Sequence, residues 1–349
     1  MDSGGRDLAA LPKAHLHLHL TGSMRRGTLV ELASRHGISA PPGVAAVGEG
    51  QPARLHGWPR FQRLYDVARH VLRDAEDLRR IVREAAEDEA DAASGWLELQ
   101  VTPDPYAALL GGLHPAMETL LAAGQDAERA TGVGVAWIIA ANRTRHPADA
   151  AVLARLAAQY AGRGVVGFGL SNDERAAPSS AFATAFRIAR SAGLLAVPHA
   201  GELCGPEAVL TTLETLLPDR IGHGVRAAED PAVVGQLAER RVACEVCPAS
   251  NVALRVFGAP HEVPLRSLVH AGVDVVLGAD DPLLFGSGLV EQYRAAREVH
   301  GLTDRELANL AAASVRRSAA PAAVRERLLA GIADWLATIP DGDRANQPG

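Results

Sequence analysis

The chain has 349 residues, of which 48% are hydrophobic and 22% are charged, and its formal net charge is −6. This composition is that of an ordinary globular protein with enough apolar material for a large core, in one α/β barrel or in two smaller domains. The acidic balance argues against a nucleic-acid partner, because binding a phosphate backbone needs clustered Lys and Arg. The opening residues MDSGGRDLAA carry no signal-like apolar stretch and no later run is long enough to span a membrane, so we expect a cytoplasmic protein without a membrane partner.

The first predicted element is a strand in the segment PKAHLHLHLTG at residues 12–22. His15, His17 and His19 occupy every second position, which is the period of a β-strand, so all three imidazoles are expected to project to the same face. Neutral imidazole is a common ligand of zinc, and two histidines at i and i+2 can reach one cation. The segment therefore predicts a metal site, although spacing alone leaves open which two of the three histidines bind the ion.

The rest of the chain alternates between apolar runs and amphipathic segments. We expect a helix at 24–36, a Pro- and Gly-rich loop or lid at 38–57, and further helices at 59–72 and 74–93. Seven apolar runs that read as strands follow, at 96–101, 134–140, 165–170, 194–198, 220–222, 242–246 and 273–277. Together with the first strand they predict a (β/α)8 barrel forming a single domain over residues 1–349, with extra helices after strand one. The last helices are expected at 289–300, 304–314 and 322–338, before a frayed tail at 339–349.

The three cysteines do not indicate a disulfide framework, because their number is odd. Cys244 and Cys247 form a CxxC within an apolar run, where strand alternation puts them on opposite faces. We therefore interpret them as buried small hydrophobic residues rather than as metal ligands or a redox pair.

Polar residues follow several of the predicted strands at their carboxyl ends, where a barrel of this type carries its active site. They are His17 and His19 after strand one, His199 after strand five, His223 after strand six, and Asp280 and Asp281 after strand eight. Their common position strengthens the prediction of a metal site.

The motifs PKxxLHxHL at 12–20, HAGE at 199–202, RIGHG at 220–224, EVCPxSN at 245–251 and DDP at 280–282 resemble those of the adenosine deaminase family of metal-dependent amidohydrolases, in the same order. The resemblance implies a site for one Zn²⁺, or another divalent transition metal, held by four residues: His17, His19, His199 and Asp280. His15 stands where the family usually has an acidic residue, and from the spacing alone a pair of His15 with His17 remains an alternative. Lys13 is the only lysine and lies four residues before His17, so we expect no carboxylated lysine bridging a second metal.

The resemblance also assigns three proton-handling roles in deamination of an adenine ring. Glu202 would be protonated and donate to N1, which requires a raised pKa. His223 would take the proton from the attacking water, and Asp281 would hydrogen-bond that water and N7. The HxxE spacing differs from the HxE and PCxxC signature of the other zinc deaminases.

The expected partner is a small adenine nucleoside bound by His19, Thr21, Asn172, Gly201 and Asp281. Thr21 replaces an aspartate that binds a ribose 5′-hydroxyl in adenosine-specific members, so we favour a 5′-modified nucleoside such as aminodeoxyfutalosine over adenosine. An acidic 5′ group would pair with one of four arginines: Arg25, Arg26, Arg143 or Arg145. Asn172 replaces a glycine whose backbone amide reaches N3, and Asn tolerates positive φ better than most residues. Adenine deamination, cyclic-amide hydrolysis and a catalytically silent binding protein remain alternatives, and the sequence does not predict the oligomeric state.

Overall fold

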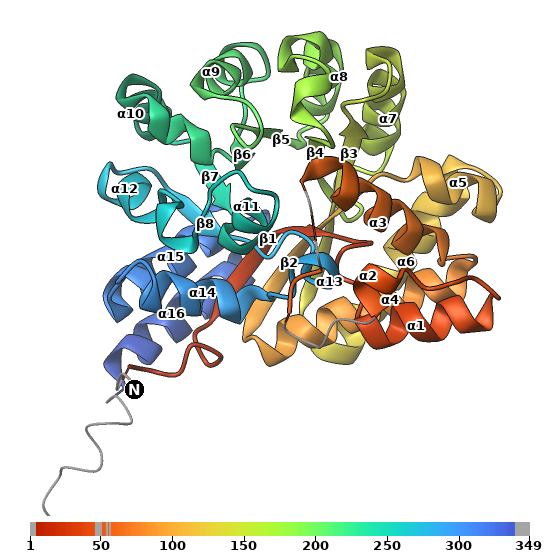
Figure 1. Ribbon diagram of the computed structural model, residues 1–349, viewed down its shortest axis with the longest axis horizontal. Coiled ribbons are helices and arrows are strands. Elements are labelled where there is room, and N and C mark those ends of the chain that lie inside the picture. Colours follow the sequence, from red (N-terminus) through yellow and green to blue (C-terminus); the bar gives the residue numbers. More distant parts are fainter. Residues whose placement is uncertain (1–4, 46–50, 54, 56, 339–349) are drawn as a thin grey trace, which may run out of the picture.

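Eight parallel strands form one sheet whose order follows the chain, as predicted for a (β/α)8 barrel. The computed structural model describes residues 5–45, 51–53, 55 and 57–338. Its strands are β1 (Lys13–His19), β2 (Ser94–Val101), β3 (Gly134–Asn142), β4 (Val165–Ser171), β5 (Leu195–Ala200), β6 (Arg220–His223), β7 (Ala243–Val246) and β8 (Val275–Leu277). All seven pairs of consecutive strands are parallel. The strands lie at the centre and the helices surround them (Figure 1).

The barrel closes between β1 and the segment that follows β8. Leu18 and Asp280 form a parallel bridge, in which the backbone N–H of Asp280 donates to His17 O at 3.0 Å. The backbone N–H of His19 donates back to Asp280 O, also at 3.0 Å. Because β8 ends at Leu277, this short seam fixes Asp280 directly against the histidines of β1.

Helices connect the strands near the predicted positions. Those between β1 and β2 are α1 (Arg26–Arg35), α2 (Pro42–Ala45), α3 (Trp58–His70) and α4 (Ala75–Asp91). Those between β2 and β6 are α5 (Asp104–Leu110), α6 (Leu113–Thr131), α7 (Pro147–Gln159), α8 (Ala183–Ser191) and α9 (Pro206–Thr215). Those after β6 are α10 (Pro231–Arg240), α11 (Pro248–Ala253), α12 (Leu265–His270), α13 (Pro282–Phe285), α14 (Leu289–Glu298), α15 (Asp304–Arg317) and α16 (Ala322–Ala337).

Two predicted segments lie partly or wholly outside the described residues. The expected loop or lid at 38–57 contains the short helix α2, and residues 46–50, 54 and 56 of it lie outside the described residues. The expected tail at 339–349 also lies outside them. Among the described residues, no helix is long and apolar enough to cross a membrane.

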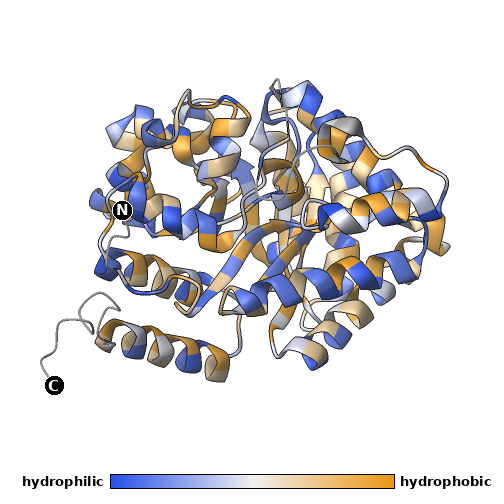
Figure 2. Ribbon diagram, turned by 60° about the horizontal axis from the view of Figure 1, so that its bottom comes forward, coloured by the Kyte–Doolittle hydropathy of each residue, from blue (hydrophilic) through white to orange (hydrophobic). Residues whose placement is uncertain are grey.

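The helices pack apolar faces onto the strands, and their hydrophilic residues face outward (Figure 2). In α4, for example, Leu78, Ile81, Val82 and Ala85 are buried, which is the i, i+3, i+4, i+7 spacing of an amphipathic helix. The side chain of Asp74 caps this helix by accepting hydrogen bonds from the backbone amides of Glu76 and Asp77. The buried core consists mainly of aliphatic residues and alanine.

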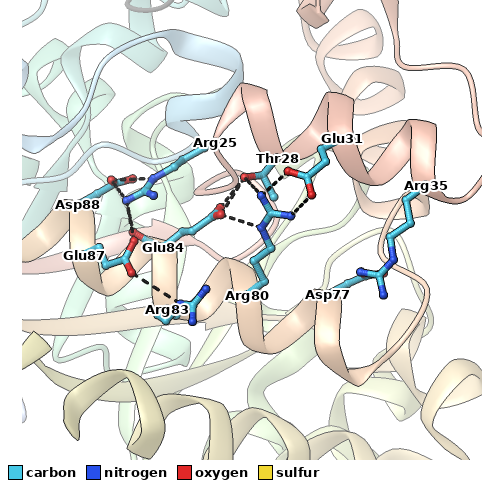
Figure 3. A network of polar contacts seen from close by, with 10 residues as sticks. All are labelled: Arg25, Thr28, Glu31, Arg35, Asp77, Arg80, Arg83, Glu84, Glu87 and Asp88. Atoms are coloured by element: carbon cyan, nitrogen blue, oxygen red, sulfur yellow. Dashed lines mark hydrogen bonds and ion pairs between the residues drawn. The ribbon is translucent and has the colours of Figure 1, made fainter. Parts of the chain in front are cut away.

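Charged residues join α1 to α4 through a polar network (Figure 3). The buried carboxylate of Glu84 accepts hydrogen bonds from Thr28 Oγ1 at 2.7 and 2.9 Å and from Arg80 Nε at 2.9 Å. Arg25 pairs with Asp88 at 2.6 Å and with Glu87 at 3.1 Å. This network fixes the helix that follows the histidine strand on the outside of the barrel.

Candidate active site

The polar residues predicted at the carboxyl ends of the strands come together at one cavity. Of the residues predicted from the motifs, those that line it are His19, Thr21, Asn172, His199, Glu202, His223, Asp280 and Asp281. His17 is fully buried, with its ring centroid 4.7 Å from that of His199 and 5.4 Å from that of His19. Residues from five strands or strand ends thus converge on one point.

The donor atoms of this cluster fit a divalent metal ion. Asp280 Oδ1 lies 3.2 Å from His19 Nε2 and 3.5 Å from His17 Nε2. His17 Nε2 and His199 Nδ1 are buried and have no hydrogen-bond partner in the described part of the chain. Leaving buried polar atoms unpaired is costly, so a cation bound by nitrogen and oxygen ligands would suit this cluster.

A buried chain of charges orients His17. Its Nδ1 lies 2.8 Å from Glu245 Oε2, and Arg220 Nε lies 2.6 Å from Glu245 Oε1. Arg220 also pairs with the buried Glu98 at 2.5 Å. With Glu245 accepting a hydrogen from Nδ1, the Nε2 lone pair of His17 faces the cluster, which is the arrangement that metal-binding histidines commonly have.

His15 does not join the other two histidines, and the prediction that all three face one side of the strand is wrong. The pairing of β1 with β2 is irregular on both sides of His15, which breaks strict alternation. His15 Nδ1 lies 2.6 Å from Glu89 Oε1 on α4, and His15 Nε2 accepts the backbone N–H of Ala279 at 2.9 Å. Both nitrogens are therefore engaged, and the alternative metal pair of His15 with His17 is not supported.

Distances within the cluster do not by themselves separate the metal ligands from their neighbours. One ligand atom from each of His17, His199 and His223 lie within 4.8 Å of one another, and so do those of His17, Cys247 and Asp280. The assignment of His223 and Cys247 outside the ligand set therefore rests on the motif resemblance. Cys244 and Cys247 are buried, as expected from the sequence.

His223 and Asp280, like Asn172 at the same cavity, adopt a backbone conformation that is uncommon for residues with a side chain. His223 has φ 63° and Asp280 has φ 62°, both in the left-handed region. Such strain costs free energy and tends to be retained at functional sites, where the surrounding structure enforces it. In both cases the conformation directs a side chain from a strand end into the cavity.

Two glycines make room for the site. A Cβ atom at Gly22 would lie 1.8 Å from Asp281 Oδ1, so any larger residue there would displace this carboxyl group. A Cβ atom at Gly222 would lie 3.0 Å from atoms of both His17 and His199. These positions explain on steric grounds why glycine ends the segment PKAHLHLHLTG and lies inside RIGHG.

The proton-handling candidates have pKa values suited to their expected roles. Burial raises the pKa of Glu202 well above its usual range, and the charges of Asp280 and Glu174 raise it further. Burial, followed by the charge of Asp280, likewise raises the pKa of Asp281. Burial lowers the pKa of His223 to about 3, against the opposing effect of Asp280. The raised pKa values favour the protonated form of the two carboxyl groups, and the lowered pKa favours the neutral imidazole, which suits two donors and one base.

The substrate-binding predictions have a mixed outcome. Thr21 is buried and its Oγ1 lies 2.8 Å from Tyr106 OH. Asn172 has φ 77°, the positive φ that the sequence allowed for. Gly201 does not line the cavity, and its N–H donates to Glu174 at 2.7 Å, so the structure does not bring its amide to a substrate.

None of the four arginines proposed for an acidic 5′ group lines the cavity. Arg25 is held by Glu87 and Asp88, Arg26 bonds the carbonyl of Leu283, and Arg145 pairs with Asp149. Arg143 is buried and donates to backbone carbonyls, one of them His199 O at 2.5 Å. Among the described residues, the arginine that lines the cavity is Arg69 on α3.

Sequence reasoning missed four residues that shape the site: Arg69, Tyr106, Glu174 and Glu245. Glu245 is the first residue of the motif EVCPxSN, where a charged residue in an otherwise apolar run was the available signal. Glu174 stands in the polar segment SNDER at 171–175, where one more charged residue gave no such signal. Arg69 and Tyr106 lie on amphipathic helices, where nothing in the local pattern distinguishes a cavity residue from an exposed one.

Comparisons with known proteins agree with this geometry. The model of the family described as adenosine deaminase matches residues 12–335. A Streptomyces coelicolor protein named "Putative adenosine/adenine deaminase" is 59% identical over 95% of this chain and 98% of its own length. An aminodeoxyfutalosine deaminase from Streptomyces avermitilis is 36% identical over 95% of this chain and 96% of its own. The crystal structure of an amidohydrolase from Burkholderia ambifaria with bound Zn superposes with a TM-score of 0.87 at 25% identity, covering 99% of this chain and 96% of that one.

Proposed function

Because the chain belongs to the adenosine deaminase family, whose members are hydrolytic deaminases of carbon–nitrogen bonds, we propose that it removes the 6-amino group of an adenine nucleoside. The products are the corresponding hypoxanthine compound and ammonia. The observation that carries the proposal is the convergence of Glu202, His223 and Asp281 at one cavity beside the His and Asp donor cluster.

The proposed metal is one Zn²⁺, or another divalent transition metal, held by His17, His19, His199 and Asp280. The unpartnered nitrogens of His17 and His199 and the zinc in the related Burkholderia ambifaria amidohydrolase support this assignment. A divalent metal bound by three nitrogens and one carboxylate lowers the pKa of water towards about 7, which supplies hydroxide at neutral pH. Lys13 donates to the carbonyls of Leu8 and Ala92 near the start of β1, in keeping with a single metal.

Three side chains of the chain then move or hold protons around the ring: His223 at C6, Glu202 at N1 and Asp281 at N7. His223 accepts a proton from the attacking water at Nε2 and passes it to the leaving amino group, which departs as ammonia. For that step Nδ1 must carry the hydrogen and needs an acceptor. Asn251 Nδ2 lies 3.2 Å from Nδ1, and Asn251 Oδ1 is buried without a partner among the described residues. The step therefore requires the Asn251 amide turned by 180°, with its oxygen accepting from Nδ1.

Glu202 donates a proton to N1 as oxygen adds to C6, and it recovers a proton when the C6 hydroxyl becomes a carbonyl. Asp281, protonated, donates to N7, which has only a lone pair to offer. We assign the backbone amide of Asn172, a residue that lines the cavity, to a contact with N3. The raised pKa values of Glu202 and Asp281 support both donor roles.

For the substrate we propose a 5′-modified adenine nucleoside with an acidic group, such as aminodeoxyfutalosine, rather than adenosine. Thr21 offers a hydroxyl already paired with Tyr106 where adenosine-specific relatives carry a carboxylate. Arg69 lies over the Tyr65 ring at 5.8 Å and lines the same cavity, and its head group can pair with a carboxylate.

A deamination screen with metal-loaded protein tests the proposal. Adenine, adenosine, an uncharged 5′-substituted adenosine and aminodeoxyfutalosine are each assayed for ammonia release and for the ultraviolet change of adenine to hypoxanthine. We expect turnover of the acidic nucleoside at a kcat/KM at least about tenfold above adenosine. Preference for free adenine would overturn the substrate assignment alone, whereas metal binding without turnover of any adenine compound would overturn the deaminase assignment.

A further inference from the structure

The carboxylate of Glu174 binds four consecutive backbone amides of the segment that carries Glu202. Glu174 Oε1 accepts the N–H of Gly201 at 2.7 Å. Glu174 Oε2 accepts the N–H groups of Glu202, Leu203 and Cys204 at 3.0, 2.7 and 2.9 Å. Glu174 is only 5% exposed, so these hydrogen bonds are shielded from water. Four amides converging on one carboxylate form a concave anion-binding backbone of the kind called a nest.

These amides need such a partner because the chain leaves the sheet at this point. β5 ends at Ala200, and Gly201 has φ 70°, so the amides of 201–204 point to one side and have no strand or helix to bond. The carbonyls of this segment are bound separately. Ala200 O accepts from Gly224 N at 3.0 Å, Gly201 O from Arg226 N at 2.9 Å, and Leu203 O from Arg226 Nη1 at 3.0 Å.

The side chain of Glu202 has no comparable support. Its carboxyl group lines the cavity, and Oε1 is buried without a hydrogen-bond partner among the described residues. The nearest ring nitrogen, His223 Nε2, is 3.6 Å away. The direction of this carboxyl group therefore depends on where the backbone of residue 202 is held.

We propose that Glu174 is a positioning residue for the deamination reaction, whose carboxylate fixes the backbone of residues 201–204 and so keeps Glu202 directed at the substrate ring. The inference rests on the proposed function for the role of Glu202, but the backbone contacts do not. An amide cannot take the place of this carboxylate. A glutamine in either orientation presents an NH₂ group to a backbone N–H, and two donors repel.

Glu174→Gln is the first test, with Glu84→Gln as a matched control. Glu84 is likewise a buried glutamate, at 6% exposure, but it lies in the network between α1 and α4 and does not line the cavity (Figure 3). We expect Glu174→Gln to retain metal at the wild-type level and to lose about 100-fold in kcat, the effect of a displaced reacting group. The control should lose activity by less than about threefold, since it changes no group at the site.

A double-mutant comparison separates positioning from general loss of structure. If Glu174 acts through Glu202, the variant with both Glu174→Gln and Glu202→Gln should be within about threefold of Glu202→Gln alone. If the double variant instead loses kcat by the product of the two single-variant factors, the proposal is wrong.

Amide hydrogen exchange tests the contacts without reference to any substrate. The amides of residues 201–204 should exchange faster than in wild type in Glu174→Gln, and at the wild-type rate in Glu84→Gln. If the wild-type protein deaminates no adenine compound but exchange is faster in Glu174→Gln, the proposed function is wrong and the backbone role of Glu174 stands. If Glu174→Gln shows unchanged exchange and normal kcat, the backbone role of Glu174 is wrong. If Glu174→Gln does not fold, Glu174→Asp, which keeps the charge but is one methylene shorter, is measured in the same ways and decides between the same outcomes.

Discussion

Two regions of this barrel are rich in charged and polar side chains, and they differ in whether those side chains are paired. In the network between α1 and α4, Glu84, Arg80 and Thr28 bond one another and Arg25 is shared by two carboxylates (Figure 3). At the cavity, buried atoms of His17, His199, Glu202 and Asp281 have no hydrogen-bond partner among the described residues. The cavity also has positive φ at His223 and Asp280, which the network lacks.

This difference shows how the same residue types serve different ends. Paired charges hold two helices together, and their loss affects stability. Unpaired buried groups and strained backbone reduce stability and are retained where a ligand or a reacting group completes them. Variants at the two regions should therefore separate activity from stability.

Removal of the metal should have the largest effect on activity. Chelation or Asp280→Ala is expected to abolish turnover, because no other group of the cavity supplies hydroxide at neutral pH. His223→Ala should keep its metal while losing activity, since we assign it to proton transfer. Metal analysis of the purified variants checks this, and a metal content of His223→Ala as low as that of Asp280→Ala would place His223 among the ligands.

Loss of the acid at Glu202 comes next. Glu202→Gln keeps a hydrogen-bond donor but cannot release a proton, so kcat should fall by about 10²- to 10⁴-fold. The protein should remain folded and loaded with metal, as judged by its melting temperature and metal content. Activity within tenfold of wild type would mean that another group protonates the ring.

Substrate choice should change by a smaller factor. Arg69→Gln is expected to lower kcat/KM for the acidic nucleoside by only about tenfold, because Arg69 is partly exposed and already paired with Asp66. The kcat/KM for adenosine should stay unchanged, because adenosine has no acidic group to pair with Arg69. Thr21→Asp should raise kcat/KM for adenosine through a charge-assisted hydrogen bond of about 1.5–3 kcal/mol, and so reduce the difference in kcat/KM between the acidic nucleoside and adenosine. Equal loss for both substrates in Arg69→Gln would remove Arg69 from substrate recognition.

The smallest effect on activity is expected in the α1–α4 network. Glu84→Gln should lower the free energy of unfolding by about 1–3 kcal/mol, because it weakens buried hydrogen bonds to Thr28 and Arg80. Denaturant unfolding measures that change, and kcat should stay within about threefold of wild type. A large loss of activity here would contradict the separation of the two regions.

The eight strands, their order and the residues at their carboxyl ends could be predicted from the sequence. Period-two and period-3.6 patterns of apolar residues are local consequences of burial, so they predicted β1 to β8 to within a few residues, together with the helices α1, α3, α4, α14, α15 and α16. The rule that parallel barrels gather their strand ends at one face then predicted that residues as distant as His17 and Asp280 would meet.

Only the tertiary structure decided which side chains within that set face the cavity. His15 has the same spacing as His17 and His19, but an irregular strand pairing and the carboxylate of Glu89 on α4 turn it away. Arg69 was indistinguishable from other helix-surface arginines, whereas Arg143, at the end of β3, is buried against backbone carbonyls. Glu174 binds the backbone of 201–204 across a gap of 27 to 30 residues. Such contacts depend on register, rotamers and the packing of distant elements, and local sequence patterns carry no information about these.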